Sequence, residues 1–220
     1  MVPTVVVPVM TLGNCVFLPQ QLLPLRIFEP RYRKMLKETL AGSRMFAVSQ
    51  LDQDSLSPDN EEPPCPFTCV GRIVGHVELE DGTSHIVLEG LRRARVIKVQ
   101  RRTPYPRLEI APVIDEASTD ILGATRDLAR VLAFAEKIVG GLGEEALPLL
   151  QRLRGLANQP GALADAAAGH LIPEVATRRQ LLECLSQDRR LQTVAEELSR
   201  LDAERNLDTQ GGDDEARGLN

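Results

Sequence analysis

The side chains best suited to chemistry are four cysteines and three histidines, spread over 220 residues. Cys65 and Cys69 have a C-x₃-C spacing that zinc sites tolerate, but a structural zinc site needs four ligands. Cys15 and His76 would have to complete such a site through the fold. We favour the alternative that the two thiols lie at a junction between a loop and a strand. The sequence therefore predicts no metal site and no cofactor.

Catalytic patterns are missing as well. A Ser-His-Asp hydrolase needs a histidine next to its nucleophile, but His76 and His85 fall on predicted strands and His170 ends a predicted helix, with no G-x-S-x-G motif nearby. The phosphate-binding pattern G-x-x-x-x-G-K-[ST] does not occur. Adjacent carboxylates such as Glu144 and Glu145 point about 100° apart on a helix, so they do not face a common substrate. We expect no catalytic residues.

Charge and composition argue against most nucleic-acid partners. The chain is 43% hydrophobic and 26% charged, which is typical of globular proteins. It has a net charge of −5, only 3% aromatic residues and no tryptophan. One basic run is an exception to this overall negative charge. We interpret it as the solvated face of a strand. The alternative is a nucleic-acid interface in which these side chains contact phosphates. This run comprises Arg92, Arg93, Arg95, Lys98, Arg101 and Arg102.

The sequence also predicts a compartment. Four cysteines are too few for a disulfide framework in a chain of 220 residues. The apolar N-terminal stretch lacks a basic segment and contains two prolines, unlike a signal peptide. No apolar run approaches the roughly 20 residues that a membrane span needs. We expect a cytoplasmic protein with reduced thiols and no membrane contact.

The composition changes near residue 115, which predicts an α+β fold in two parts. We expect a β-rich domain over residues 1–114, a helical bundle over 115–205 and a disordered tail over 206–220. Strands are predicted at 4–9, 45–51, 94–99 and 105–113, with an acidic, proline-rich loop at 52–66. Helices are predicted at 121–139, 144–156, 160–170, 172–185 and 188–201.

One short helix is predicted from the stretch LPLRIFEPRYRKML, which begins at residue 23. Pro30 suits the first helical position because its missing N–H would have no helical partner there. Glu29 then occupies the N-cap and can pair with Arg33 one turn later. Gly42 is expected to end the helix in a left-handed conformation. We interpret the stretch as a structural joint with binding as a second role.

A β-hairpin is predicted around Asp81 and Gly82, a favoured pair for a two-residue type I′ turn. With that turn, Val77 faces Ile86 on one side of the hairpin. Glu78 faces His85 on the other side, as a cross-strand pair of polar side chains.

Three segments carry a family resemblance: VFLPQQLLPLRIFEPRYRKML, VGRIVGHVELEDGTSHIVLEGLRRARV and PYPRLEIAPV. In this order and spacing they resemble the N-terminal substrate-binding domain of Lon proteases, which also occurs in cereblon and in stand-alone bacterial proteins. RRQLLECLSQDRRLQTVAEEL resembles the helical bundle that follows in that family. The resemblance covers residues 4–203 and implies a six-stranded, PUA-like pseudo-barrel packed on helices. Gln20-Gln21 stand where the family usually has a glycine turn.

The resemblance implies a non-enzymatic module that binds unfolded or exposed apolar polypeptide segments. We expect such a module to act as an adaptor in proteolysis or protein quality control, with a protease among its partners. We expect no ATPase or Ser-Lys protease domain, and a monomer or weak homodimer. As binding residues we predict Phe28, Arg31, Tyr32, Met35, Arg92 and Arg93. Phe28, Tyr32 and Met35 also suit positions in a core. Arg92 and Arg93 also suit a solvated face. As structural residues we predict Glu29, Pro30, Asp81, Gly82 and Gly90.

Overall fold

The computed structural model describes residues 3–58, 61–100 and 104–217, and the chain forms two compact units. The first unit comprises Met1–Asp115 and Pro173–Leu185, and the second comprises Glu116–Ile172 and Ser186–Asn220. The segment 173–185, which the sequence assigns to the helical part, thus belongs to the β-rich unit. Its helix α5 (Val175–Glu183) buries Leu181 and Leu182 and packs against strand β4.

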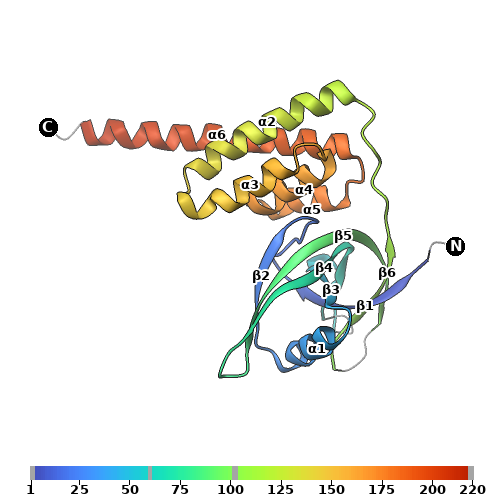
Figure 1. The fold of residues 1–220 in the computed structure, drawn as a ribbon. Helices are drawn as coiled ribbons and strands as arrows, with labels where there is room; N and C mark the ends of the chain where they lie inside the picture. The colour runs from blue at the N-terminus through green and yellow to red at the C-terminus, as the bar shows by residue number, and fades with distance from the viewer. Residues whose placement is uncertain (1–2, 59–60, 101–103, 218–220) are drawn as a thin grey trace. The chain divides into compact units, whose positions relative to one another are not determined.

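Six strands form the sheet of the first unit, in the order β2-β5-β4-β3-β1-β6 (Figure 1). Strand β6 also pairs with β5, so five of the six strands close into a ring and β2 extends it. Buried side chains from four strands fill one cluster of its core: Val9, Ala47, Ala94, Leu108 and Ile110. The strands are β1 (Val5–Leu12), β2 (Leu22–Ile27), β3 (Met45–Leu51), β4 (Pro64–Glu78), β5 (Ser84–Gln100) and β6 (Arg107–Pro112).

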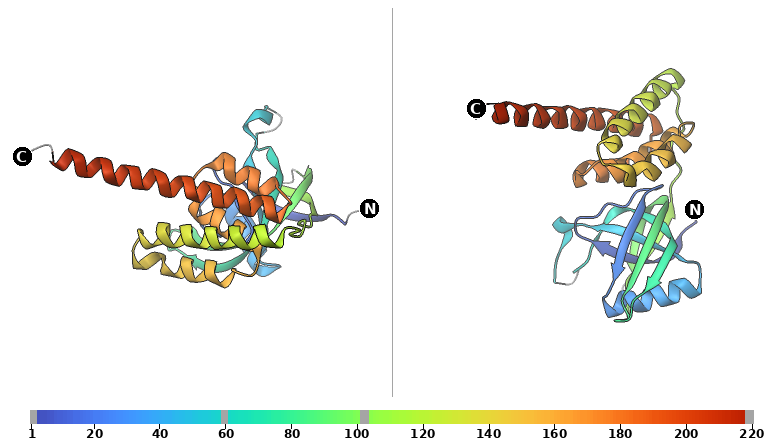
Figure 2. Two further views of the ribbon diagram at one scale, coloured as in Figure 1. Left: turned by 90° about the horizontal axis from the view of Figure 1, so that it is seen from above. Right: turned by 60° about the vertical axis from the view of Figure 1, so that its left-hand side comes forward.

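Helix α1 (Pro30–Ala41) confirms the predicted helix and lies across one end of the strand ring (Figures 1 and 2). Pro30 begins it and Glu29 occupies the N-cap, but the Glu29 side chain does not cap the helix. It accepts a hydrogen bond from Arg31 Nε at 2.9 Å, so the predicted pairing with Arg33 is wrong. The left-handed cap at Gly42 is also wrong, because Gly42 has φ −119°.

The hairpin turn differs from the prediction by one residue. Only Gly82 has a positive φ, 72°, whereas a type I′ turn needs a positive φ at both central residues. Asp81 instead accepts hydrogen bonds from the backbone N–H and the hydroxyl of Thr83 at 2.8 and 2.7 Å. The loop has three residues, and Leu79 and Thr83 close it through a 2.8 Å hydrogen bond. Val77 therefore pairs with His85, not with Ile86.

The segment before β2 is tied to β5 at one point. Gln20 N–H donates to Gly90 O at 2.8 Å, and Gly90 N–H donates to Gln21 O at 2.9 Å. The Gln21 side chain accepts a further hydrogen bond from Leu18 N–H at 3.0 Å. Gln20 has φ 65°, which is the left-handed conformation that glycine adopts most easily. The family that the sequence resembles usually has glycine in this turn. These contacts hold the start of β2 in its register.

The second unit is helical. Helix α2 runs alongside α6, with Lys137 Nζ 3.1 Å from Asp202 Oδ2 (Figure 2). Between α4 and α6, a fully buried Arg190 pairs with Asp165 at 3.2 Å. Disorder is predicted from residue 206, whereas α6 continues as a helix to Arg217. The helices are α2 (Ile121–Gly140), α3 (Leu147–Gly155), α4 (Pro160–Leu171) and α6 (Gln187–Arg217), with a short 3₁₀ turn η2 at Glu144–Ala146.

Candidate functional site

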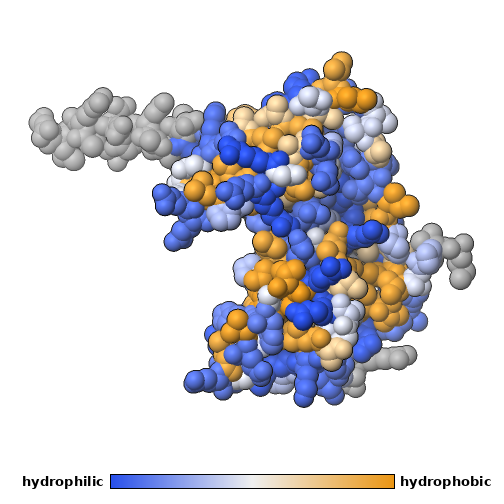
Figure 3. Space-filling model, viewed as in Figure 1, coloured by the Kyte–Doolittle hydropathy of each residue, from blue (hydrophilic) through white to orange (hydrophobic). Residues whose placement is uncertain are grey.

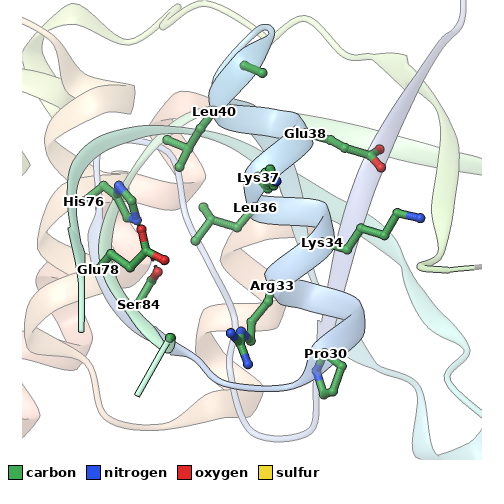
Figure 4. A pocket seen from close by; sticks show the side chains of 12 residues that line it. Pro30, Arg33, Lys34, Leu36, Lys37, Glu38, Leu40, His76, Glu78 and Ser84 are labelled. Atoms are coloured by element: carbon green, nitrogen blue, oxygen red, sulfur yellow. Dashed lines mark hydrogen bonds between the residues drawn. The ribbon is translucent and has the colours of Figure 1, made fainter. Parts of the chain in front are cut away.

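A pocket of about 960 Å³ lies between α1 and the β4–β5 hairpin, within the first unit (Figure 4). We call it the helix–hairpin pocket. One wall is the side of α1 that carries Arg33, Leu36, Lys37 and Leu40. Its size is in the range typical of ligand-binding sites in proteins. The pocket is a candidate binding site because apolar and charged side chains meet in it.

Helical spacing explains the first wall. Positions three and four residues apart lie on the same face of a helix, so Arg33, Leu36, Lys37 and Leu40 line one side of α1. Leu36 is buried and Leu40 is half-buried, and together they form an apolar floor. The charged ends of Arg33 and Lys37 are exposed beside this floor (Figure 4).

The observed hairpin register explains the second wall. His76 lies opposite Ile86, and Glu78 lies opposite Ser84, so both side chains share the face of β4–β5 that turns toward α1. His76 Nε2 is 3.2 Å from Ser84 Oγ, within hydrogen-bond distance. The second wall is therefore polar, in contrast to the apolar floor.

Cations outnumber free carboxylates in the pocket. Arg33, Lys34 and Lys37 line it together with Glu38 and Glu78. Glu38 accepts a hydrogen bond from the Tyr105 hydroxyl and lies 3.9 Å from Arg107, so its charge is partly neutralised outside the pocket. Burial is the main cause of the raised pKa of Tyr105, and the hydrogen bond to Glu38 adds to it.

Arg33 reaches across the pocket to the hairpin turn. A methyl group built on Gly82 would lie only 2.3 Å from a guanidinium nitrogen of Arg33. The Arg33 guanidinium therefore lies close to the Gly82 backbone. This contact marks one end of the pocket with a positive charge.

Two predicted binding residues on α1 have structural contacts outside the pocket. Arg31 binds Glu62 through two hydrogen bonds of 2.6 and 2.9 Å, and this pairing raises the pKa of its guanidinium. The guanidinium also lies 4.5 Å from the centre of the Tyr32 ring. Tyr32 is buried, and burial together with the Glu62 carboxylate raises its pKa to about 12. The structure thus brings Arg31 and Tyr32 together, but away from the pocket.

The other four predicted binding residues are spread over the unit. Met35 is fully buried in the core, whereas Phe28, immediately after β2, is 60% exposed. Arg92 is exposed on β5. Arg93 is only 3% exposed and its guanidinium lies 2.6 Å from Asp115. None of these four lines the helix–hairpin pocket.

The basic run on β5 is divided between environments. Arg93 is buried and paired, and Arg95 lies 5.0 Å from the centre of the Phe67 ring. Arg92 and Lys98 are exposed. Arg101 and Arg102 lie outside the described residues.

Sequence reasoning missed the residues that do line the pocket. The sequence predicts Arg33 only as a partner of Glu29, indicates no role for Lys37 and places His76 on an ordinary strand face. Pro30 and Gly82 were predicted as structural and also line the pocket. The helical spacing of Arg33, Lys37 and Leu40 was a usable signal. The hairpin wall is not predictable from the sequence, because the predicted pairing of the two hairpin strands differs by one residue from the observed pairing.

Exposed hydrophobic side chains occur outside the pocket as well. In Figure 3 they gather over β2 and over the end of the β4–β5 hairpin. Val77 is 61% exposed and lies beside His85, which in turn lies beside Arg26 of β2. These positions are on the outer face of the hairpin, opposite to the pocket.

The described part of the chain lacks two other kinds of feature. Among those residues, no group of three or more histidine, cysteine, aspartate or glutamate side chains could hold a metal ion. Within the same ranges, no helix combines the length and the apolar character needed to cross a membrane.

Comparison with known proteins identifies a family. The model of the ATP-dependent protease La (LON) substrate-binding domain matches residues 6–200. The chain is 24% identical to the Lon protease of Dictyoglomus thermophilum over 197 residues, 89% of this chain and 24% of that protein. It is 28% identical to the Lon protease of Nitratidesulfovibrio vulgaris over 200 residues, 86% of this chain and 23% of that protein. The chain thus spans about a quarter of the length of the curated relatives it matches.

Solved structures show the same fold. The N-terminal domain of the Mycobacterium avium complex Lon protease superposes with a TM-score of 0.64 at 21% identity, covering 88% of this chain and 98% of that one. A Lon N-terminal domain protein from Xanthomonas campestris gives a TM-score of 0.60 at 22% identity, covering 86% and 96%. The six-stranded sheet and the helices described above are therefore a known arrangement.

Proposed function

Because the chain belongs to the LON substrate-binding domain family, we propose that it recognises polypeptide substrates and that the helix–hairpin pocket holds them. The observation that carries this proposal is the pocket itself, with its apolar floor of Leu36 and Leu40 and its charged rim. A large pocket of this composition suits an apolar side chain and the polar backbone next to it. No catalytic step is required of the chain in this role.

The size of the site sets the kind of segment that it can bind. Burial of one leucine-sized side chain contributes about 1.5–3 kcal/mol, whereas a micromolar complex requires about 8 kcal/mol. Several contacts are therefore needed, from two or three apolar side chains and the hydrogen bonds of the backbone. A folded protein keeps such side chains in its own core, so the pocket would select unfolded or exposed segments.

We further propose that the chain acts as an adaptor in proteolysis or protein quality control, with a separate protease as its partner. In this role it neither hydrolyses ATP nor cuts peptide bonds. The same proposal has three further parts. The compartment is the cytoplasm, and the chain is a monomer or weak homodimer. The architecture is a PUA-like pseudo-barrel with a helical bundle. The resemblance of residues 4–203 to the family supports the adaptor role and the architecture.

The proposal predicts that the apolar floor determines affinity. Leu40→Asn keeps the size of a half-buried side chain but makes it polar. We expect the dissociation constant for a fluorescently labelled, reduced and carbamidomethylated polypeptide to rise about five- to thirtyfold, because about 1–2 kcal/mol of apolar contact is lost. Fluorescence anisotropy at constant ionic strength measures this change.

The matched control is Leu56→Asn, the same substitution at an exposed leucine outside the pocket. This variant should bind like the unmodified chain. Equal weakening by both substitutions, or weakening by neither, would show that the pocket does not hold the polypeptide. Circular dichroism of each variant reports whether the fold is intact.

A further inference from the structure

We infer that the helix–hairpin pocket prefers apolar segments carrying two acidic side chains two residues apart. This inference rests on the proposed function and names the class of polypeptide that the pocket selects. Three features carry it: the unpaired cations of α1, the position of the nearby carboxylates and the spacing along the helix.

Three cations line the pocket, but the Lys34 side chain points away from the hairpin (Figure 4), so Arg33 and Lys37 are the two considered as partners of a ligand. Within the described part of the chain, neither Arg33 nor Lys37 forms a side-chain hydrogen bond or an ion pair. Both are exposed, and they lie four residues apart on one face of α1. The chain as a whole has a net charge of −5, so this pair of free cations contrasts with its overall charge.

The carboxylates of the pocket do not neutralise this pair. Glu38 is held by the Tyr105 hydroxyl and lies near Arg107. Glu78 lies on the opposite wall, on the hairpin. The Arg33 guanidinium lies near the Gly82 backbone, not beside an acidic side chain. The helix side of the pocket is therefore positively charged and needs an acidic ligand for charge complementarity.

The spacing of the two cations indicates where the acidic side chains belong. Four residues of a helix span about 6 Å along its axis. Alternate residues of an extended chain lie about 6.6–6.8 Å apart and point to the same side. Two acidic side chains at positions i and i+2 can thus reach Arg33 and Lys37 together. A free C-terminal carboxylate supplies a charge for only one of them.

The floor explains why the segment must also be apolar. Leu36 and Leu40 lie on the same face of α1 as the two cations. A chain whose acidic side chains contact Arg33 and Lys37 passes directly over this apolar surface. Leucine or another large apolar residue next to the acidic positions would bury it, which excludes a purely acidic segment as the preferred ligand.

Three labelled peptides test the inference by fluorescence anisotropy. The first contains Glu-Leu-Glu within an apolar segment and ends in an amide, the second has glutamine in place of both glutamates, and the third is the glutamine peptide with a free C-terminal carboxylate. We expect the glutamate peptide to bind about three- to tenfold more tightly than the glutamine peptide at low salt. The difference should shrink at high salt because the charges are exposed.

A pair of double variants tests whether Arg33 and Lys37 cause the preference for the glutamate peptide. Arg33→Gln with Lys37→Gln should remove the preference for glutamate, so that the glutamate and glutamine peptides bind this variant equally well. Arg72→Gln with Lys98→Gln changes the charge equally at exposed positions outside the pocket and should retain the preference.

Two outcomes overturn the inference while the proposed function stands. One is equal affinity for the glutamate and glutamine peptides. The other is an equally strong preference for the free C-terminal carboxylate, which would make the pocket a reader of chain ends. Failure of all three peptides and of the unfolded polypeptide to bind would instead overturn the proposed function itself.

Discussion

Asp165→Ala is expected to lower the free energy of unfolding of the second unit by about 3–5 kcal/mol. Arg190 is 0% exposed, and its guanidinium lies 3.2 Å from the Asp165 carboxylate between α4 and α6. Removal of the carboxylate leaves a buried positive charge without this counter-charge, and a buried charge is costly in a medium of low dielectric constant. Urea unfolding followed by circular dichroism measures the change.

Two further variants separate this effect from a general loss of ion pairs. Glu136→Ala breaks the exposed pair with Arg154, which has a 2.7 Å contact, and should cost at most about 1 kcal/mol. Replacement of both buried partners, as Asp165→Leu with Arg190→Met, should restore most of the stability lost in Asp165→Ala. Equal costs for Asp165→Ala and Glu136→Ala would contradict the account of the buried pair.

Gly90→Ala is expected to destabilise the first unit by about 3 kcal/mol or more. A methyl group at Gly90 would lie 2.1 Å from the carbonyl oxygen of Leu18 and 3.1 Å from Cα of Pro19. Both neighbours are backbone atoms, so no side chain can turn aside to make room. Relief of the clash would break the hydrogen bonds that join Gly90 to Gln20 and Gln21.

The control for this prediction is Gly13→Ala. A methyl group there has no atom within 4 Å, so the substitution should change stability by less than about 0.5 kcal/mol. Thermal unfolding of both variants tests the comparison. A Gly90→Ala variant as stable as Gly13→Ala would show that the segment before β2 can move away from β5 at little cost.

Local signals in the sequence predict much of the first unit. Pro30 and the spacing of apolar residues predict α1, and the strand over residues 45–51 coincides with β3. These elements depend on residues close together in the chain. The turn at Asp81-Gly82 was predicted at the right place, but its type was wrong. Asp81 binds the Thr83 backbone and hydroxyl, which favours a three-residue loop over a type I′ turn.

The type of this turn determines which side chains of the hairpin face the pocket. A shift of one residue in a hairpin moves every side chain to the other face of the strand. The predicted register places Val77 beside Ile86 on one side of the hairpin. In the structure His76 lies beside Ile86, while Val77 is exposed on the outer face. The polar wall of the pocket was therefore absent from the prediction.

Other features depend on contacts between distant residues, which no local pattern reveals. Spacing alone allows Tyr32 and Met35 to be either ligand-binding or core residues, and in the structure both are buried. The sequence pattern places Arg93 on a solvated strand face, whereas in the structure its guanidinium is buried and lies 2.6 Å from Asp115, 22 positions later. Helix α5 has the composition of the helical part but packs on β4.

The most direct test of the central claim is to map where an unfolded polypeptide binds. Amide chemical shifts of the isotope-labelled chain, followed by NMR during titration with a reduced and carbamidomethylated polypeptide, provide this map. We expect the largest changes along the exposed side of α1 and at the facing positions of the hairpin, including Lys37, His76 and Gly82. Changes confined to other surfaces, or no changes at saturating polypeptide, would contradict recognition through the helix–hairpin pocket.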